Sequence, residues 1–299
     1  IMARLMPYLQ LMRIPNVFTA MADIFMGYLI VLRSFYPLTD FFFLLTASCC
    51  LYTGGMVLND IFDYDQDLRE RPQRPLPSGR IRTISAWKLC LVLGFVGISC
   101  AALAGKQSFS IAVLLLIAII LYDIFLKHYW TGPIAMGCCR MLNVLLGMST
   151  MLHGIVSLEG NLFWQILPAC AMGSYIIGVT WLARNEASTN TSLQLFPSIV
   201  LINLIFSVMA LILFQSSFQD SLAPWFLLVL SIGLINRSLI KALFTPEPVP
   251  IQKAVKACLL CYIPLTGALA SGLLPSWESF SILLLLAPAT WMGKWIYST

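Results

Sequence analysis

Long apolar runs dominate the chain and decide what it can fold into. A helix needs about 20 apolar residues to cross the hydrocarbon core of a bilayer, and runs of that length recur along the sequence. Only 10% of the 299 residues are charged, whereas soluble domains carry about 25%. The sequence therefore predicts an all-α membrane protein with nine or ten spans. The ten candidate spans are residues 15–32, 38–58, 86–105, 108–126, 131–152, 161–182, 196–214, 222–243, 253–273 and 278–296.

The positively charged residues indicate how these spans are oriented, because lysine and arginine gather on the cytoplasmic side of membrane proteins. With ten spans and both ends of the chain cytoplasmic, 16 of the 18 lysines and arginines fall on that side, and Arg33 and Lys106 fall outside. Nine spans would move Lys294 outside as well. We predict a multi-pass protein of the cell inner membrane. The net charge of +5 reflects this asymmetry and does not indicate nucleic-acid binding.

The order of apolar runs and polar loops suggests a repeated plan within one domain. No linker-like segment divides the chain, so a single domain over residues 1–299 is predicted. The second span ends at Asn59 and the sixth near Arg184, and each is followed by a polar loop and two further spans. We expect two four-helix halves around a central cavity, with cytoplasmic cap loops at about 59–85 and 183–195.

The most acidic stretch of the chain, NDIFDYDQD, follows directly after the second apolar run. Asp60, Asp63 and Asp67 have the spacing i, i+3, i+7, so a continuing helix would place them on one face, with Asn59 beside it. Carboxylates held together repel one another unless a cation lies among them. Mg²⁺ prefers oxygen ligands and combines one or two carboxylates with substrate phosphates. The stretch predicts a Mg²⁺ site for a diphosphate; the alternative is a solvated helix end whose acids pair with nearby arginines.

The next fifteen residues, LRERPQRPLPSGRIR, contain five arginines and three prolines. Arginine binds phosphate through two parallel hydrogen bonds, and we expect Arg74 and Arg80 to face the site. The prolines and Gly79 should stiffen and turn this loop over the acidic stretch. Anionic lipid head groups are an alternative ligand for some of these arginines.

These two stretches carry a family resemblance. NDxxDxxxD followed by RPxRPLPSGxI resembles the first signature of the UbiA superfamily of intramembrane prenyltransferases, and Asn59 and the three aspartates match it without a gap. LMRIPN, which contains Arg13 and Asn16, is similar to the opening motif of that family. The resemblance implies a UbiA-type helical bundle that transfers a prenyl group from its diphosphate to an acceptor and needs Mg²⁺. It also implies substrate contacts for Arg13, Asn16 and Asn59.

The end of the fourth span, LYDIFLK, resembles the Tyr-and-Lys motif of the same family, which contacts the diphosphate. Here five residues separate Tyr122 from Lys127, where four are usual. Asp123 lies in the last turn of a span and needs a partner, and Lys127 at i+4 is the expected one. Lysine at a helix end can instead extend its charge to the interface.

Arg140 and Asn143 lie inside the fifth predicted span, three residues apart and on one face. An arginine at this depth should face a polar cavity. We expect both side chains at the site, with a structural ion pair or an extension of Arg140 to the interface as alternatives.

WLARNEAST, at residues 181–189, lies where the family has a second aspartate-rich motif with two or three acids for a second Mg²⁺. This chain has Arg184, Asn185 and Glu186 there. That form, together with the closing GKWIYST, resembles the EboC branch of the superfamily. Two interpretations stay open. Arg184 supplies positive charge in place of a second metal, or the site no longer ionises the substrate.

The implied mechanism uses Mg²⁺ on Asp60, Asp63 and Asp67 to neutralise the leaving diphosphate. Lys127, Arg140 and Arg184 would add fixed positive charge. The expected partners are a prenyl diphosphate, an unidentified acceptor and membrane lipid, without nucleic acid.

The first alternative is a non-catalytic UbiA-like protein that binds or transports a prenylated or lipid-like molecule. The second is an ion-coupled transporter, which is disfavoured because the charges gather at one membrane face and not at the midplane.

Overall fold

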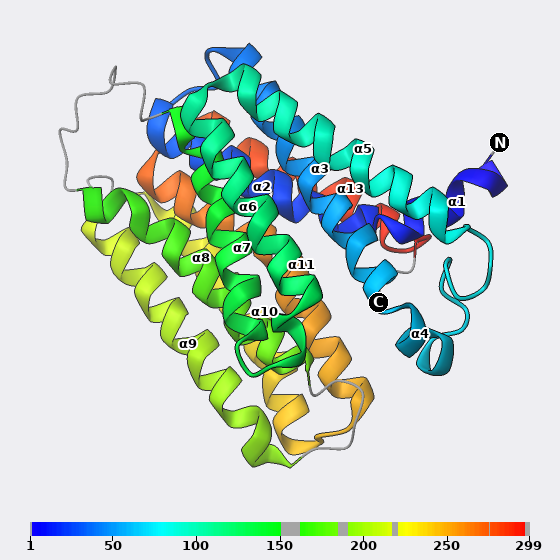
Figure 1. Ribbon diagram of the computed structural model, residues 1–299. Coiled ribbons are helices and arrows are strands. Elements are labelled where there is room, and N and C mark those ends of the chain that lie inside the picture. The colour runs from blue at the N-terminus through cyan, green and yellow to red at the C-terminus, as the bar shows by residue number, and fades with distance from the viewer. Residues whose placement is uncertain (1, 151–161, 185–190, 217–220, 275, 297–299) are drawn as a thin grey trace.

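The computed structural model describes residues 2–150, 162–184, 191–216, 221–274 and 276–296, and all the regular elements in these ranges are helices (Figure 1). Among them, eight helices are long and apolar enough to cross a membrane. These are α2 (Ile14–Leu32), α3 (Leu38–Phe62), α5 (Thr83–Ala104), α6 (Lys106–Ile124), α8 (Leu162–Ala183), α9 (Ser192–Gln215), α10 (Leu222–Phe244) and α11 (Pro248–Leu273). A ninth apolar helix, α7 (Gly132–Gly147), is shorter.

The last predicted span, residues 278–296, does not form a continuous helix. It is divided into α12 (Trp277–Phe280), the 3₁₀ helix η3 (Ser281–Leu285) and α13 (Leu286–Met292). Pro288 lies in the first turn of α13, and its ring has no N–H for a bond back to the preceding turn. The helix therefore restarts near this proline. The segment packs against α2 and α11 instead of adding a tenth long helix to the bundle.

Two hydrophobic clusters fill the bundle, and both include residues of α2 and α7. One cluster joins them to α3, α5 and α6 and contains Ile24, Tyr28 and Leu146. The other joins them to the later helices α8 to α11 and contains Met26 and Val144. The bundle thus packs as two groups that share the pair of helices between them, and the division into two four-helix halves stays a prediction.

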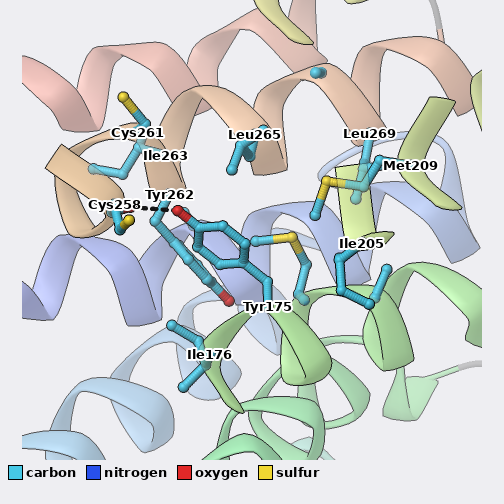
Figure 2. Close-up of a cluster of buried hydrophobic side chains, with 14 of the residues drawn as sticks. Tyr175, Ile176, Ile205, Met209, Cys258, Cys261, Tyr262, Ile263, Leu265 and Leu269 are labelled. Carbon is cyan, nitrogen blue, oxygen red and sulfur yellow. Dashed lines mark hydrogen bonds between the residues drawn. The ribbon is translucent and has the colours of Figure 1, made fainter. Parts of the chain in front are cut away.

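The second cluster is built around two tyrosines from helices that are far apart in sequence. The rings of Tyr175 on α8 and Tyr262 on α11 lie beside each other, with centroids 6.1 Å apart (Figure 2). The Tyr175 hydroxyl donates a hydrogen bond of 2.9 Å to the carbonyl oxygen of Cys258. A tyrosine hydroxyl in a dry interior needs such a partner. The two rings thereby fix α8 against α11.

The outer helices turn much of their apolar surface away from the protein. α5 packs along α3 yet buries few of its residues, and Leu91, Val92 and Phe95 are among its exposed side chains. α6 and α10 are similarly exposed, whereas α2 and α11 are largely buried. Continuous apolar exposure of this kind is unfavourable in water and favourable in lipid, so it agrees with a membrane-spanning bundle.

Glycines allow α2 and α7 to approach closely. A Cβ atom added to Gly27 would lie 2.5 Å from the carbonyl oxygen of Val144, and one added to Gly147 would lie 2.9 Å from the backbone of Ile24. Small residues at such crossings let the backbones of membrane helices approach each other. The close contact between the two shared helices therefore depends on these two positions.

The Gly27→Ala variant should be less stable by about 1–3 kcal/mol, because the added methyl group forces the helices apart. The measurement is the thermal unfolding midpoint of the purified protein in detergent. Gly94→Ala is the matched control, since a Cβ there meets no atom within 4 Å and alanine favours the helix by up to about 1 kcal/mol. Equal midpoints for the two variants would show that the crossing tolerates extra volume.

A short helix and an ordered loop cover one end of the bundle. α4 (Tyr64–Glu70) follows α3 and lies at the same end as α1 (Met2–Leu11) (Figure 1). The proline-rich loop after α4 is fastened by the buried side chains of Leu76 and Ile81. These pack with Leu11, Val57 and Ile61 in a small third cluster. The arginine-rich loop is therefore held in place by apolar contacts on both sides of its turn.

Candidate active site

The acidic stretch lies where α3 ends, and the helix does not continue through it as expected. Asp63 is the C-terminal cap of α3 and precedes the first residue of α4, with φ −86° and ψ 4°. Asp60 lies in the last turn of α3 and Asp67 in α4, and both are buried. The interruption is confined to Asp63, and the Asp67 N–H still donates a hydrogen bond of 2.8 Å to the Asp63 carbonyl oxygen, so one shared face stays a prediction. The three aspartates contact different cations: Asp63 pairs with Lys127, whereas Asp60 and Asp67 share Arg74.

Arg74 bridges Asp60 and Asp67. Its Nη1 lies 2.7 Å from Asp67 Oδ2 and 3.5 Å from Asp60 Oδ1. Burial raises the pKa of the Asp67 carboxyl, and the hydrogen bond from Arg74 opposes this rise. The arginine-rich loop thus reaches back over the end of α3, as predicted for Arg74.

Arg13 provides a second cation for Asp60. Its Nη2 lies 2.8 Å from Asp60 Oδ1. The residue connects α1 to α2 and has a left-handed backbone with φ 48°, which is uncommon for residues other than glycine. Asn16 lies one turn further on, where its carbonyl oxygen accepts a hydrogen bond from the Thr19 hydroxyl. The opening motif therefore places an arginine on the acidic cluster and a polar residue at the start of α2.

The Tyr-and-Lys segment at the end of α6 also contacts the acidic stretch. The residues that form its contacts differ from those expected. Lys127 Nζ lies 2.5 Å from Asp63 Oδ1, whereas the carboxylate of Asp123 accepts a hydrogen bond of 3.0 Å from the Asn59 amide. The predicted Asp123–Lys127 pair was wrong because α6 ends at Ile124. The chain then forms the 3₁₀ helix η1 (Leu126–His128), so helical i, i+4 spacing no longer applies.

A second polar cluster lies deeper, between α2, α7 and α11. Asp23, which is fully buried in α2, lies 2.9 Å from Nη1 of Arg140 and accepts a hydrogen bond of 2.6 Å from the Tyr262 hydroxyl. The Asn143 amide donates a further bond of 2.9 Å to Asp23. The Arg140 guanidinium also lies over the rings of Tyr262 and Tyr52. The positive charge of Arg140 is thus balanced by Asp23 inside the protein. This contact agrees with the structural ion pair that was the alternative to a site role for Arg140.

Asp23 was not among the residues predicted for the site, although the sequence contains a signal for it. An aspartate nine residues into a predicted span is costly without a partner. The complementary arginine, Arg140, is 117 residues away in sequence. Pairing the two rare intramembrane charges would have suggested this contact.

An apolar cavity of about 540 Å³, counted with its open mouth, lies between α3, α6 and α7. The lining combines polar side chains from both clusters with a larger apolar set. The lining residues are Tyr52, Gly55, Met56, Leu115, Ile119, Tyr122, Asp123, Met136, Cys139, Arg140 and Asn143.

The remaining predicted residues make other contacts or lie outside the described residues. Arg80 is exposed, and it donates hydrogen bonds to the side chain of Gln10 and the carbonyl oxygen of Gln73. It therefore holds the loop in place, and among the described residues it makes no contact with the three aspartates. Arg184 donates a hydrogen bond of 2.7 Å to the carbonyl oxygen of Lys127 and another to that of Tyr129. Asn185 and Glu186 lie outside the described residues.

Comparison with known proteins identifies the family. The sequence pattern of the UbiA prenyltransferase family matches residues 20–255, which is more than half of the chain.

The chain belongs to the UbiA prenyltransferase family. A curated relative, the digeranylgeranylglyceryl phosphate synthase of Sulfurisphaera tokodaii, is 36% identical over 121 residues, which are 40% of this chain and 43% of that protein. The match thus spans less than half of the relative's length. The prediction of the UbiA superfamily is confirmed, and membership of the EboC branch stays a prediction.

Solved structures show the same fold as this UbiA-family chain. One, from work on the biosynthesis of digeranylgeranylglyceryl phosphate synthase in membranes, has a TM-score of 0.64 at 21% identity and covers 92% of this chain and 100% of that one. A UbiA homologue from Archaeoglobus fulgidus bound to DMAPP and Mg²⁺ has a TM-score of 0.52 at 14% identity, with coverage of 96% and 99%. The predicted helical bundle of UbiA type is therefore confirmed.

The acidic cluster of this UbiA-family protein has donors suited to Mg²⁺. Asp60 and Asp67 present buried carboxylate oxygens on the two sides of a cationic group, Arg74. Within the described ranges, no three acidic, histidine or cysteine side chains are grouped closely enough to hold a metal ion by themselves. A Mg²⁺ ion here would complete its coordination with phosphate oxygens and water, which is its usual behaviour.

Proposed function

We propose that this protein transfers a prenyl group from a prenyl diphosphate to an acceptor within the membrane and that it uses Mg²⁺. The observation that carries the proposal is the set of three aspartates at the end of α3, each in contact with a cationic side chain. This set lies next to a largely apolar cavity between membrane helices, and Asn59 and Asp123 connect the two. One end of such a site suits a diphosphate and the other suits a hydrocarbon chain.

At the end of the bundle that carries the three aspartates, acidic and basic side chains would have different roles toward the diphosphate. Bound Mg²⁺ would neutralise charge on the leaving diphosphate, and Asp60 and Asp67 are the proposed ligands, with Asp63 as the third. Arg13 and Arg74 contact these carboxylates in the structure, and both would also donate hydrogen bonds to phosphate oxygens of the substrate. Fixed donors of this kind stabilise developing charge without reorganising. The structure of the Archaeoglobus fulgidus homologue with DMAPP and Mg²⁺ supports this pairing of ligand and metal.

Two further residues set the position of Lys127. Its ammonium group pairs with Asp63, and Arg184 holds the carbonyl oxygens of Lys127 and Tyr129. We propose that Lys127 binds the diphosphate and that Arg184 positions the segment that carries it. Arg184 would then supply the positive charge that a second metal ion would otherwise bring.

The cavity would hold the reacting ends of both substrates and keep water from the allylic cation. Tyr122 and Asn143 line it. Because Asp23 matches the charge of Arg140, we propose that Arg140 shapes the cavity wall and orients polar groups there. The names of the curated relatives suggest an acceptor class, a glyceryl phosphate that already carries one prenyl chain. We further propose that the cap faces the cytoplasm from the inner membrane.

The test is the release of diphosphate by purified protein in detergent. Geranylgeranyl or farnesyl diphosphate would be supplied with a prenylated glyceryl phosphate, a phenol or a lipid extract as acceptor, with and without Mg²⁺. We expect release that requires Mg²⁺ and increases with one acceptor. Release that is equally fast in excess chelator would contradict the metal assignment.

One sequence observation supports a second candidate, a UbiA-family protein that binds a prenylated lipid without chemistry. Residues 181–189 contain a single acid, Glu186, at the position of the second metal motif. In that case the protein should bind geranylgeranyl diphosphate in a Mg²⁺-dependent manner and release no diphosphate with any acceptor in the panel.

A further inference from the structure

Asp123 differs from the other acids near the site in what it faces and what it contacts. It is buried, and it is the one carboxylate among the described residues that line the cavity. It is held by the neutral amide of Asn59 at 3.0 Å. Asp60, Asp63 and Asp67 contact arginine or lysine. Asp123 therefore lines the cavity with a neutral hydrogen-bond partner, where each of the other three acids has a direct ion pair.

The hydrogen bonds of Asp123 leave one oxygen available. Asn59 binds Oδ1, and the described part of the chain provides no donor to Oδ2. By contrast, the buried Asp23 accepts hydrogen bonds from Arg140, Asn143 and Tyr262. A carboxylate that is paired with a cation is a poorer proton acceptor than one held by an amide.

We infer that Asp123 is the general base that takes the proton from an acceptor hydroxyl during prenyl transfer. This inference rests on the proposed function. In the step, the bond between the allylic carbon and the diphosphate oxygen breaks, and the diphosphate keeps the electron pair. The acceptor oxygen bonds to that carbon and loses its proton to Asp123 Oδ2. The products are a prenyl ether, diphosphate and protonated Asp123, which returns its proton to water when the products leave.

Asn59 has a defined part in this step. Its amide group donates to Oδ1 and so leaves Oδ2 of a cavity-lining carboxylate for the acceptor. Asn59 is the residue before Asp60, so the group that orients the base belongs to the same helical turn as a proposed metal ligand. Asn59 is thus a positioning residue, and Asp123 is the catalytic residue.

The experiment compares the wild-type protein with Asp123→Asn and with the matched control Asp65→Asn, an exposed acid on α4. Three quantities are measured with geranylgeranyl diphosphate and Mg²⁺. They are the dissociation constant of that substrate, diphosphate release without acceptor, and transfer to a glyceryl phosphate that carries one geranylgeranyl chain. General bases contribute about 10²–10⁴-fold to rate. We expect Asp123→Asn to lose transfer by that factor while binding and acceptor-free release change less than about threefold.

An acceptor with a more acidic hydroxyl provides a signature that a merely structural role would not produce. A fluorinated alcohol with a prenyl-like chain gives up its proton more readily, so it depends less on a base. The Asp123→Asn defect should be at least about tenfold smaller with this acceptor than with its unfluorinated counterpart.

Two results would overturn the assignment of Asp123. One is a folded Asp123→Asn protein that transfers to the alcohol at the wild-type rate. The other is an equal loss of binding, acceptor-free release and transfer, which would place Asp123 in the diphosphate site. Failure of the proposed function looks different, because the wild-type protein itself would then release no diphosphate with any acceptor.

Discussion

Replacing Asp60 by asparagine is expected to lower Mg²⁺-dependent diphosphate release by about 10³-fold, close to the effect of removing one preorganised charge-stabilising group. The side chain keeps its size and loses its charge. Asp60 contacts both Arg13 and Arg74 and is buried at the end of α3. No other acid contacts both arginines in the described structure, so neighbouring carboxylates cannot take over its position.

The measurement for Asp60→Asn is the rate of release over a range of Mg²⁺ concentrations. The concentration that gives half of the maximal rate should rise, because a carboxylate ligand is a stronger donor to Mg²⁺ than an amide. Asp65→Asn on α4 is the control and should behave like the wild-type protein. A folded Asp60→Asn protein with unchanged Mg²⁺ dependence would remove Asp60 from the metal site.

Replacing Asp23 by leucine should destabilise the protein by about 3–5 kcal/mol, because it leaves a buried arginine without its counter-charge. Asp23 is 0% exposed and lies 2.9 Å from Arg140. The same substitution also removes the acceptor for the Tyr262 hydroxyl and the Asn143 amide. Three helices, α2, α7 and α11, therefore lose a common contact.

The double variant Asp23→Leu/Arg140→Met separates the unpaired charge from the loss of packing. Removing both charges should restore much of the unfolding midpoint that the single variant loses, since apolar pairs of similar volume often replace buried ion pairs without loss. Thermal unfolding in detergent gives these midpoints. If the double variant is no more stable than Asp23→Leu alone, the ion pair does not account for the effect.

The sequence was most informative where chemistry depends on local spacing. The apolar runs predicted the long helices because hydrocarbon thickness sets their length. The run from Asn59 to Asp67 and the position of Arg74 predicted an acidic cluster with an arginine over it, and the structure contains both. These features are short-range, so they can be recognised without knowing how the helices pack.

The errors arose where a helix ends or where packing selects a partner. The expected Asp123–Lys127 pair assumed a helix through residue 127, but α6 ends at Ile124. The continuous helix expected through the three aspartates is likewise interrupted at Asp63. The Asp23–Arg140 pair joins residues 117 positions apart and depends on the crossing of α2 and α7. Periodicity alone contains no information about such contacts.

The exposed apolar surface of α5 should allow its sequence to change quickly during evolution. A helix that packs against α3 and α6 and leaves most of its apolar side chains exposed needs little beyond apolarity at those exposed positions. α5 can therefore accumulate substitutions freely and adapt the protein to bilayers of different thickness. α2, which is shared by both hydrophobic clusters and carries Asp23, has no such freedom. Sequence drift among orthologues should be fast in one helix and slow in the other.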